Sequence, residues 1–309
     1  MALDPQGRRV TPGDPEPVAE LRELAVPSPD GRLPARTYRP DAAGRRWPLP
    51  VLVYFAGGGL GHGDLELADR PCRALANATG ALVASVAYRA APEHPFPAAV
   101  LNGRAAASWF AEQADELGGD PTRIGVAGDG LGGAVAAVVA QRAREYGDPV
   151  LALQLLICPS VALAGPRLSP PRASDLLGLP PTIVVTADRD PRCGEGQAYA
   201  RAMADAGVPV LDLRPETLAP GFLASIGTAA GSPAGAVAGA GSVAGAVAGA
   251  VAGVGSAPGS VAGSVAGSPA GSVAGAVAGA AASAAAGAVL DQIGARAREV
   301  FATAVSATR

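Results

Sequence analysis

The sequence predicts an α/β fold with a mainly parallel central sheet and helices on both of its faces. Up to residue 215, short apolar stretches rich in Val, Leu and Ile alternate with longer stretches of helical periodicity. The apolar stretches are nearly continuous and are bounded by Gly or Pro, as expected of strands that are buried on both faces. This alternation indicates right-handed crossovers between parallel strands.

The expected elements follow one another along the chain. An antiparallel pair of strands at the sheet edge is predicted for 18–26 and 33–38. Further strands are predicted at 50–56, 81–88, 123–128, 151–158, 181–187 and 209–214, and helices at 64–79, 98–117, 131–146 and 194–206. A closing helix is predicted at 288–306, because its apolar residues recur with helical spacing. These residues are Val289, Ile293, Ala297 and Val300.

Charge and composition exclude several classes of function. The net charge of -3 gives no basic surface for nucleic acid, so no nucleic-acid partner is expected. Three cysteines are too few for a disulfide framework, and with two histidines they predict neither a metal site nor a cofactor. The first residues contain no apolar leader segment, so a cytoplasmic protein is expected.

Residues 227–287 are a low-complexity segment of Gly, Ala, Val and Ser, with units repeating every four residues. The predicted organisation is a tail at 1–17, one α/β domain formed by 18–226 plus 288–309, and the repeat as an insertion before the last helix. Small side chains bury little area, which favours a flexible linker. The alternatives are self-association through the segment and a membrane span, against which the lack of Leu, Phe and Trp argues.

Four motifs occur in a fixed order. They are Ala56-Gly57-Gly58-Gly59 with Gly63-Asp64, the segment from Tyr88 to Ala99, Gly128-Asp129-Gly130-Leu131-Gly132-Gly133, and Asp190-Pro191 with Glu195-Gly196. Together they resemble the motifs of the hormone-sensitive-lipase-type carboxylesterases and lipases, which have the α/β-hydrolase fold. The resemblance spans residues 18–226 and 288–306, and the combination of motifs is specific to that family.

The resemblance implies ester hydrolysis by a serine, an acid and a histidine, with backbone N–H groups that bind the oxyanion. Gly130 stands at the position of the nucleophilic serine and Pro220 at that of the histidine, whereas Asp190 is retained as the acid. The remnant of the oxyanion loop comprises Ala56, Gly57, Gly58, Gly59 and Leu131. Leu131 directly follows Gly130, which stands at the sharp strand-to-helix turn known as the nucleophile elbow. Cys193 lacks a histidine neighbour, so no cysteine mechanism is predicted.

The family also carries cap segments before the first strand and after the strand at 151–158. Here the first strand is predicted near residue 18, and about twenty residues connect 151–158 to the next strand, so the cap is predicted to be reduced or missing.

These departures predict a pseudoenzyme, an esterase-family fold without carboxylic ester hydrolase activity that binds a small molecule or a protein partner. One alternative is a non-hydrolytic cyclase or lyase that uses the remnant pocket with Asp190 as acid or base. The others are a residual carboxylesterase and a structural protein whose active part is the repeat.

Overall fold

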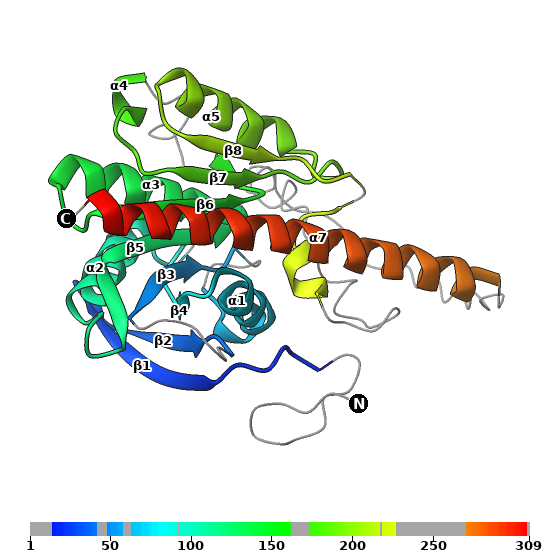
Figure 1. Ribbon diagram of the computed structural model, residues 1–309, viewed down its shortest axis with the longest axis horizontal. Helices are drawn as coiled ribbons and strands as arrows, with labels where there is room; N and C mark the ends of the chain where they lie inside the picture. The colour runs from blue at the N-terminus through cyan, green and yellow to red at the C-terminus, as the bar shows by residue number, and fades with distance from the viewer. Residues whose placement is uncertain are drawn as a thin grey trace, which may run out of the picture.

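A computed structural model of the chain describes residues 14–41, 48–57, 63–91, 93–161, 173–216, 218–226 and 270–307. These ranges form one eight-stranded sheet with helices on both faces (Figure 1). Several predictions concern residues outside the described ranges. These are the placement of Gly58 and Gly59, the tail up to residue 13, and the repeat from 227 to 269. The prediction of a reduced cap is affected too, because residues 162–172 of the connection between 151–158 and the next strand lie outside the described ranges.

The sheet confirms the predicted α/β fold. Its strands are β1 (Glu20–Ser28), β2 (Gly31–Arg39), β3 (Leu49–Phe55), β4 (Leu82–Val86), β5 (Gly119–Asp129), β6 (Leu151–Ile157), β7 (Thr182–Val185) and β8 (Val210–Leu213). Their spatial order is β1-β2-β4-β3-β5-β6-β7-β8. β2 pairs antiparallel with β1 and with β4, and all other neighbours are parallel. The carboxyl ends of β3, β5, β6 and β7 therefore meet at one edge of the sheet.

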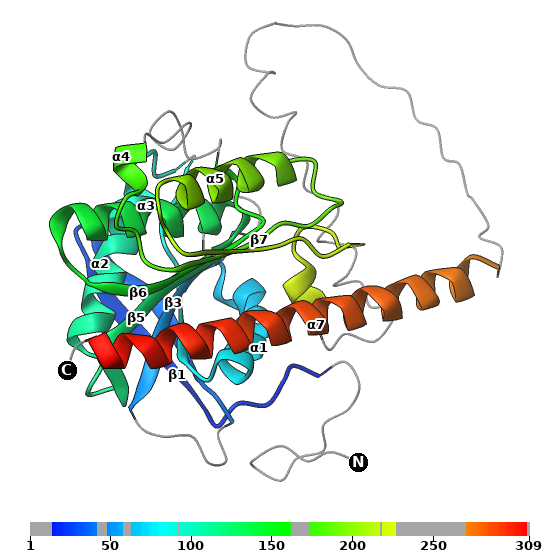
Figure 2. The ribbon, with the colours of Figure 1, turned by 45° about the horizontal axis from the view of Figure 1, so that its top comes forward.

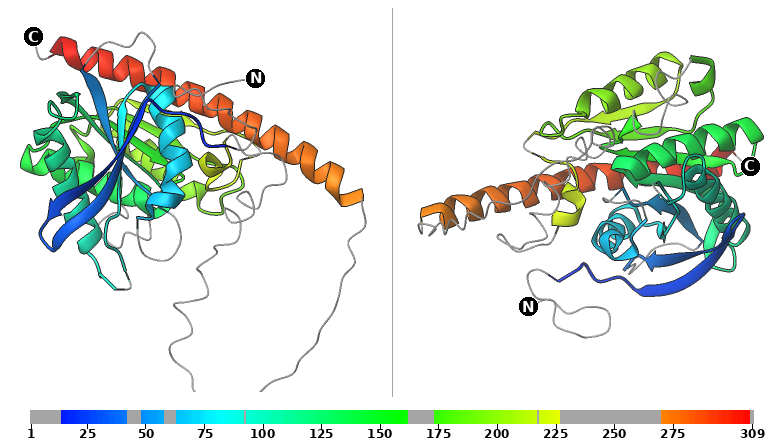
Figure 3. Two further views of the ribbon diagram at one scale, coloured as in Figure 1. Left: turned by 90° about the horizontal axis from the view of Figure 1, so that it is seen from below. Right: turned by 180° about the vertical axis from the view of Figure 1, so that it is seen from behind.

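The helices form two layers. They are α1 (Leu65–Thr79), α2 (Ala98–Glu112), α3 (Gly130–Tyr146), α4 (Ala173–Leu176), α5 (Cys193–Asp205) and α7 (Ala270–Ala307), with a 3₁₀ turn η2 (Phe222–Ser225). The core on one face of the sheet contains residues of α2, α3 and α5. The core on the other face contains residues of α1, η2 and α7, and α1 lies against α7 (Figure 3).

Burial on both faces explains why the central strands are apolar throughout. In β3, Val53 and Phe55 belong to the core beneath α2 and α3, whereas Leu52 and Tyr54 belong to the core beneath α1 and α7. All four side chains are buried. Successive residues of a strand point to opposite faces, so a strand covered on both sides needs an apolar residue at nearly every position.

The last helix is longer than predicted, since α7 begins at Ala270 instead of residue 288. The orange amino-terminal part of α7 extends beyond the sheet, whereas its carboxyl-terminal part lies across it (Figure 2). Ala286, Ile293 and Phe301 are buried in the core. Extending an existing helix needs no new nucleus, and alanine has the highest helix propensity, which offsets the glycine in each four-residue unit. The predicted boundary at residue 287 therefore falls inside a helix.

Two other elements end earlier than predicted. The helix predicted at 98–117 ends at Glu112 and is followed by a turn in which the N–H of Gly119 donates to the carbonyl of Ala114. The strand predicted at 81–88 ends at Val86. The N–H of Ala87 still donates to the carbonyl oxygen of Pro34 on β2, but Pro34 has no N–H with which to continue the ladder. Tyr88 instead bonds through its hydroxyl to Ala56, at the start of the glycine loop. Tyr88 therefore lies beyond the carboxyl end of β4, at the same end of the strands as the site motifs.

The position of α7 predicts which part of the repeat contributes to stability. Replacing residues 228–269 with a Gly/Ser linker of about 20 residues should leave the thermal midpoint nearly unchanged, because loop-closure entropy grows slowly with length. Replacing 228–287 should lower the midpoint, because that change also removes the buried Ala286. Differential scanning calorimetry of both variants against the parent measures this difference. Equal midpoints for the two variants would contradict the prediction.

Candidate active site

The nucleophile position lies where β5 turns into α3. Gly130 adopts a φ of 51°, in the left-handed region that side chains disfavour. A Cβ atom built on Gly130 would have the carbonyl oxygen of Gly57 as its nearest neighbour, at 3.6 Å. The elbow therefore has the strained geometry expected of a nucleophile turn and room for a side chain, but Gly130 places no reactive atom there.

The glycine loop begins at Ala56 and Gly57, directly beside this turn. A Cβ atom on Gly57 would lie 1.8 Å from the carbonyl oxygen of Asp129 and 2.9 Å from the amide nitrogen of Leu131. Gly57 and Leu131, which the sequence predicts as neighbours in the oxyanion-binding region, thus come together. Ala56 precedes them and is buried.

Three side chains hold this part of the loop. The hydroxyl of Tyr88 donates to the carbonyl oxygen of Ala56 at 2.7 Å. The N–H of Gly57 donates to Oδ1 of Asp129 at 2.9 Å, and the hydroxyl of Tyr54 donates to the same oxygen at 2.6 Å. The far end of the loop is also tied, since the N–H of Gly63 donates to the carbonyl of Tyr88 at 3.2 Å.

Burial dominates the electrostatics at the elbow. It raises the pKa of Asp129 above its ordinary value, and the hydrogen bonds from Tyr54 and Gly57 act in the opposite direction. Burial also holds the pKa of Tyr54 well above its ordinary value, so its phenol remains a donor. A carboxylate that accepts two hydrogen bonds inside the protein is a stable support for the loop.

Asp190, the predicted acid, lies after β7. Asp190 is 3% exposed, and its Oδ1 accepts the N–H of Arg192 at 2.9 Å. The guanidinium Nε of Arg192 is 4.0 Å from that oxygen. The N–H of Arg189 donates to the carbonyl of Leu218 at 3.1 Å, which brings the turn containing Pro220 beside the acid. Pro220 offers no titratable group that could pair with the carboxyl group of Asp190, and the contacts of that carboxyl group with Arg192 come from its own turn.

β6 connects the elbow to the acid. The N–H of Ser160 donates to the carbonyl oxygen of Gly130 at 2.9 Å, and the N–H of Cys158 donates to that of Val185 at 2.7 Å. Cys158 has a φ of 44°, which is rare for a residue with a side chain. Burial raises the pKa of its thiol to about 12, and the nearby Asp190 carboxylate adds to the rise.

The supporting roles of five residues were not predicted from the sequence: those of Tyr54, Tyr88, Asp129, Cys158 and Ser160. Asp129 and Tyr88 belong to recognised motifs, but only the three-dimensional structure shows what their side chains bind. For Cys158 and Ser160 the one available signal was the position after β6, because neighbouring parallel strands end side by side.

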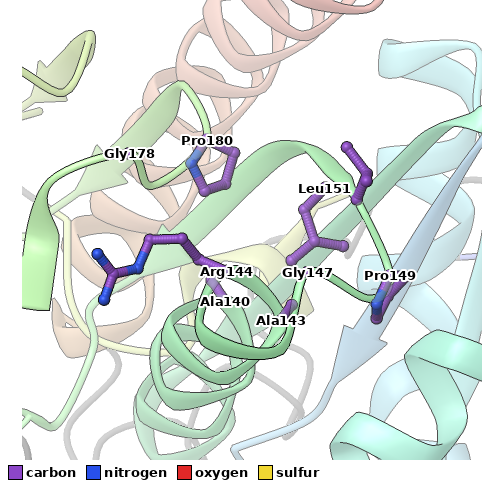
Figure 4. Close-up of a pocket in the computed structure, with 9 residues that line it drawn as sticks. Ala140, Ala143, Arg144, Gly147, Pro149, Leu151, Gly178 and Pro180 are labelled. Atoms are coloured by element: carbon purple, nitrogen blue, oxygen red, sulfur yellow. The ribbon is translucent and has the colours of Figure 1, made fainter.

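Other features of the described chain lie outside this site. The described residues include no group of three or more His, Cys, Asp or Glu side chains suited to a metal ion. Among the helices that the structure describes, none combines the length and apolar character that crossing a membrane requires. A cavity of about 190 Å³ lies at the amino end of β6 and the carboxyl end of α3, and Arg144 and Leu151 line it (Figure 4). It is at the opposite end of the strands from Gly130.

The chain is similar in sequence to a family model and to known proteins. Residues 52–166 and 160–219 match the family model described as alpha/beta hydrolase fold. Esterase LipI of Mycobacterium tuberculosis is 37% identical over 246 residues, which cover 67% of this chain and 77% of LipI. Carboxylesterase NlhH of the same species is 37% identical over 250 residues, covering 68% of this chain and 78% of NlhH.

Solved structures agree with these sequence relatives. The hyperthermophilic esterase from Pyrobaculum calidifontis superposes with a TM-score of 0.60 at 38% identity, over 67% of this chain and 77% of its own. A thermostable carboxylesterase from a metagenomic library superposes with a TM-score of 0.62 at 36% identity, over 68% of this chain and 83% of its own. The chain therefore belongs to the hormone-sensitive-lipase-type carboxylesterase family of the α/β-hydrolase fold.

Proposed function

We propose that the chain binds an ester-like small molecule at the elbow and does not hydrolyse it. The observation that carries this proposal is Gly130, which offers no nucleophilic atom at the turn between β5 and α3. Acyl transfer in this family needs a nucleophile and a base. Pro220 stands where the base is expected. Loss of triad members typically lowers turnover by ~10⁴–10⁶.

The retained backbone supports binding. The first N–H groups of a helix have no partner within the helix, and the side chain of Asp129 forms no capping hydrogen bond at the start of α3. Such donors attract a carbonyl oxygen. Gly57 is held beside Leu131 by close backbone contact. An ester carbonyl placed at this point meets N–H donors but no attacking group.

Retained ester hydrolysis is the second candidate, and the names of the relatives favour it. LipI is named an esterase and NlhH a carboxylesterase, and this chain is 37% identical to each of them. Hydrolysis would need a nucleophile from outside the elbow position. Within the described ranges, Ser160 bonds through its N–H to the carbonyl oxygen of Gly130, and Cys158 follows the β6 residue that pairs with Asp129. Ser160 is 2% and Cys158 is 5% exposed. The raised pKa of the Cys158 thiol opposes formation of the thiolate.

The two candidates differ in turnover of an activated ester. The parent should release p-nitrophenol from p-nitrophenyl butyrate no faster than Gly130→Ala, because neither protein has a nucleophile at the elbow. The control substitution fits sterically, since its Cβ would lie 3.6 Å from the nearest atom. Turnover that exceeds this control and disappears in Asp190→Ala would establish the second candidate.

The triad positions should restore activity only as a unit. Gly130→Ser supplies a hydroxyl without a base, and Pro220→His supplies a base without a nucleophile, so each alone should leave turnover near the parent's. The double variant should exceed the product of the two single effects, because triad residues act together. Steady-state rates on p-nitrophenyl butyrate for the four proteins measure this. Family-like turnover of Gly130→Ser alone would reveal a base elsewhere and contradict the role assigned to Pro220.

The cysteines provide a separate test of a hidden nucleophile. Cys193 is partly exposed, whereas Cys72 and Cys158 are buried. At pH 8 the Cys158 thiol, with a pKa of about 12, is almost entirely protonated. Iodoacetamide should therefore label Cys193 before the other two, as peptide mass spectrometry of a time course will show. Rapid labelling of Cys158 in the folded protein would mean that its thiol is accessible and ionised.

A further inference from the structure

One peptide group in the glycine loop is held at both of its polar atoms. The carbonyl oxygen of Ala56 accepts the hydroxyl of Tyr88 at 2.7 Å. The N–H of Gly57, which belongs to the same peptide bond, donates to Oδ1 of Asp129 at 2.9 Å. Because a peptide group is planar, two hydrogen bonds at its opposite ends fix the orientation of the whole plane.

Both partners are rigid. Asp129 is the last residue of β5, and its Oδ1 also accepts the Tyr54 hydroxyl at 2.6 Å. The Tyr88 side chain is 2% exposed, and its ring packs edge-to-face on Phe55 with centroids 6.0 Å apart. Two buried side chains from different segments thus hold the Ala56–Gly57 peptide, and neither can swing away without breaking its packing.

The orientation of this peptide sets the position of the ligand site. A Cβ atom built on residue 130 would have the carbonyl oxygen of Gly57, the next carbonyl of the loop, as its nearest neighbour, at 3.6 Å. The nitrogen of Leu131 lies 2.9 Å from the place of a Gly57 Cβ. A rotation of the Ala56–Gly57 peptide would therefore move the loop backbone relative to the N–H donors of α3.

We infer that Asp129 and Tyr88 are positioning residues that clamp the Ala56–Gly57 peptide and thereby set the carbonyl-binding geometry of the elbow. This inference rests on the proposed function for the identity of the ligand as an ester-like carbonyl. Neither residue touches the reacting position itself. Asp129 points away from the α3 amino terminus toward Gly57 and Tyr54, as its hydrogen bonds and its missing helix cap indicate.

The clamp can be tested by amide hydrogen exchange on the full-length ¹⁵N-labelled protein. Asp129→Ala should speed the exchange of the Gly57 amide by about tenfold, because it removes the acceptor of that hydrogen bond. Asp129→Asn keeps an acceptor oxygen and should restore most of the protection. Tyr54→Phe is the matched control, because it removes the other donor to Oδ1 and leaves the Gly57 bond. The amide of Val53 in β3 reports the integrity of the sheet.

Unchanged Gly57 exchange in Asp129→Ala would overturn the clamp. So would a rise at Val53 as large as that at Gly57, because Asp129 would then support the strand and not the loop peptide. If Asp129→Ala fails to fold, the Gly57 amide proton shift of Asp129→Asn decides, since exchanging the acceptor from a carboxyl to an amide oxygen should change that shift. An unchanged shift would then overturn the inference.

Ligand binding separates a positioning role from a structural one. Titration with 2-heptanone, an unhydrolysable ester mimic, should give a dissociation constant at least about tenfold higher in Asp129→Ala and Tyr88→Phe than in the parent. Faster Gly57 exchange with an unchanged dissociation constant would reject the positioning role. If the parent itself does not bind the ketone, the proposed function fails, whereas the exchange measurements still decide whether the clamp exists.

Discussion

The close passage of the first turn of α3 against β3 is the constraint on which the site depends. A Cβ atom on Gly132 would lie 1.9 Å from the carbonyl oxygen of Phe55, and one on Gly128 would lie 2.3 Å from that of Gly132. No side chain fits at either position, so glycine alone permits this crossing. The crossing places the start of α3 beside the end of β3. The glycine loop, which continues β3, consequently begins in contact with the elbow.

Much of the fold follows from the sequence because its signals are local. Continuous apolar stretches such as 50–56 predict strands buried on both faces, and α1 begins where Asp64 caps the N–H groups of Glu66 and Leu67. The amino-terminal extension of α7 could not be predicted in the same way. Its four-residue units suit both a flexible chain and a helix, and the choice depends on the packed residues that follow.

The site divides into a predictable and an unpredictable part. The order of the motifs predicts Gly130, Asp190 and Pro220 as the positions of the nucleophile, the acid and the base, because the family keeps that order along the chain. The contacts that shape the loop are long-range. Tyr88 and Ala56 are 32 residues apart, and Asp129 and Gly57 are 72 apart. Such pairs depend on the order of the strands in the sheet, which local periodicity does not reveal.

The residue at position 130 and the residues that support the glycine loop are under different physical constraints. A residue with a side chain at a φ of 51° carries strain of about 1–2 kcal/mol, so glycine at position 130 avoids that strain. Removing the carboxylate of Asp129 would instead leave the buried hydroxyl of Tyr54 and the N–H of Gly57 without their acceptor. The carboxyl group of Asp129 is therefore needed for the stability of this part of the fold, whereas position 130 accommodates glycine without strain. This difference explains how the supporting contacts of the loop remain intact around a glycine at position 130.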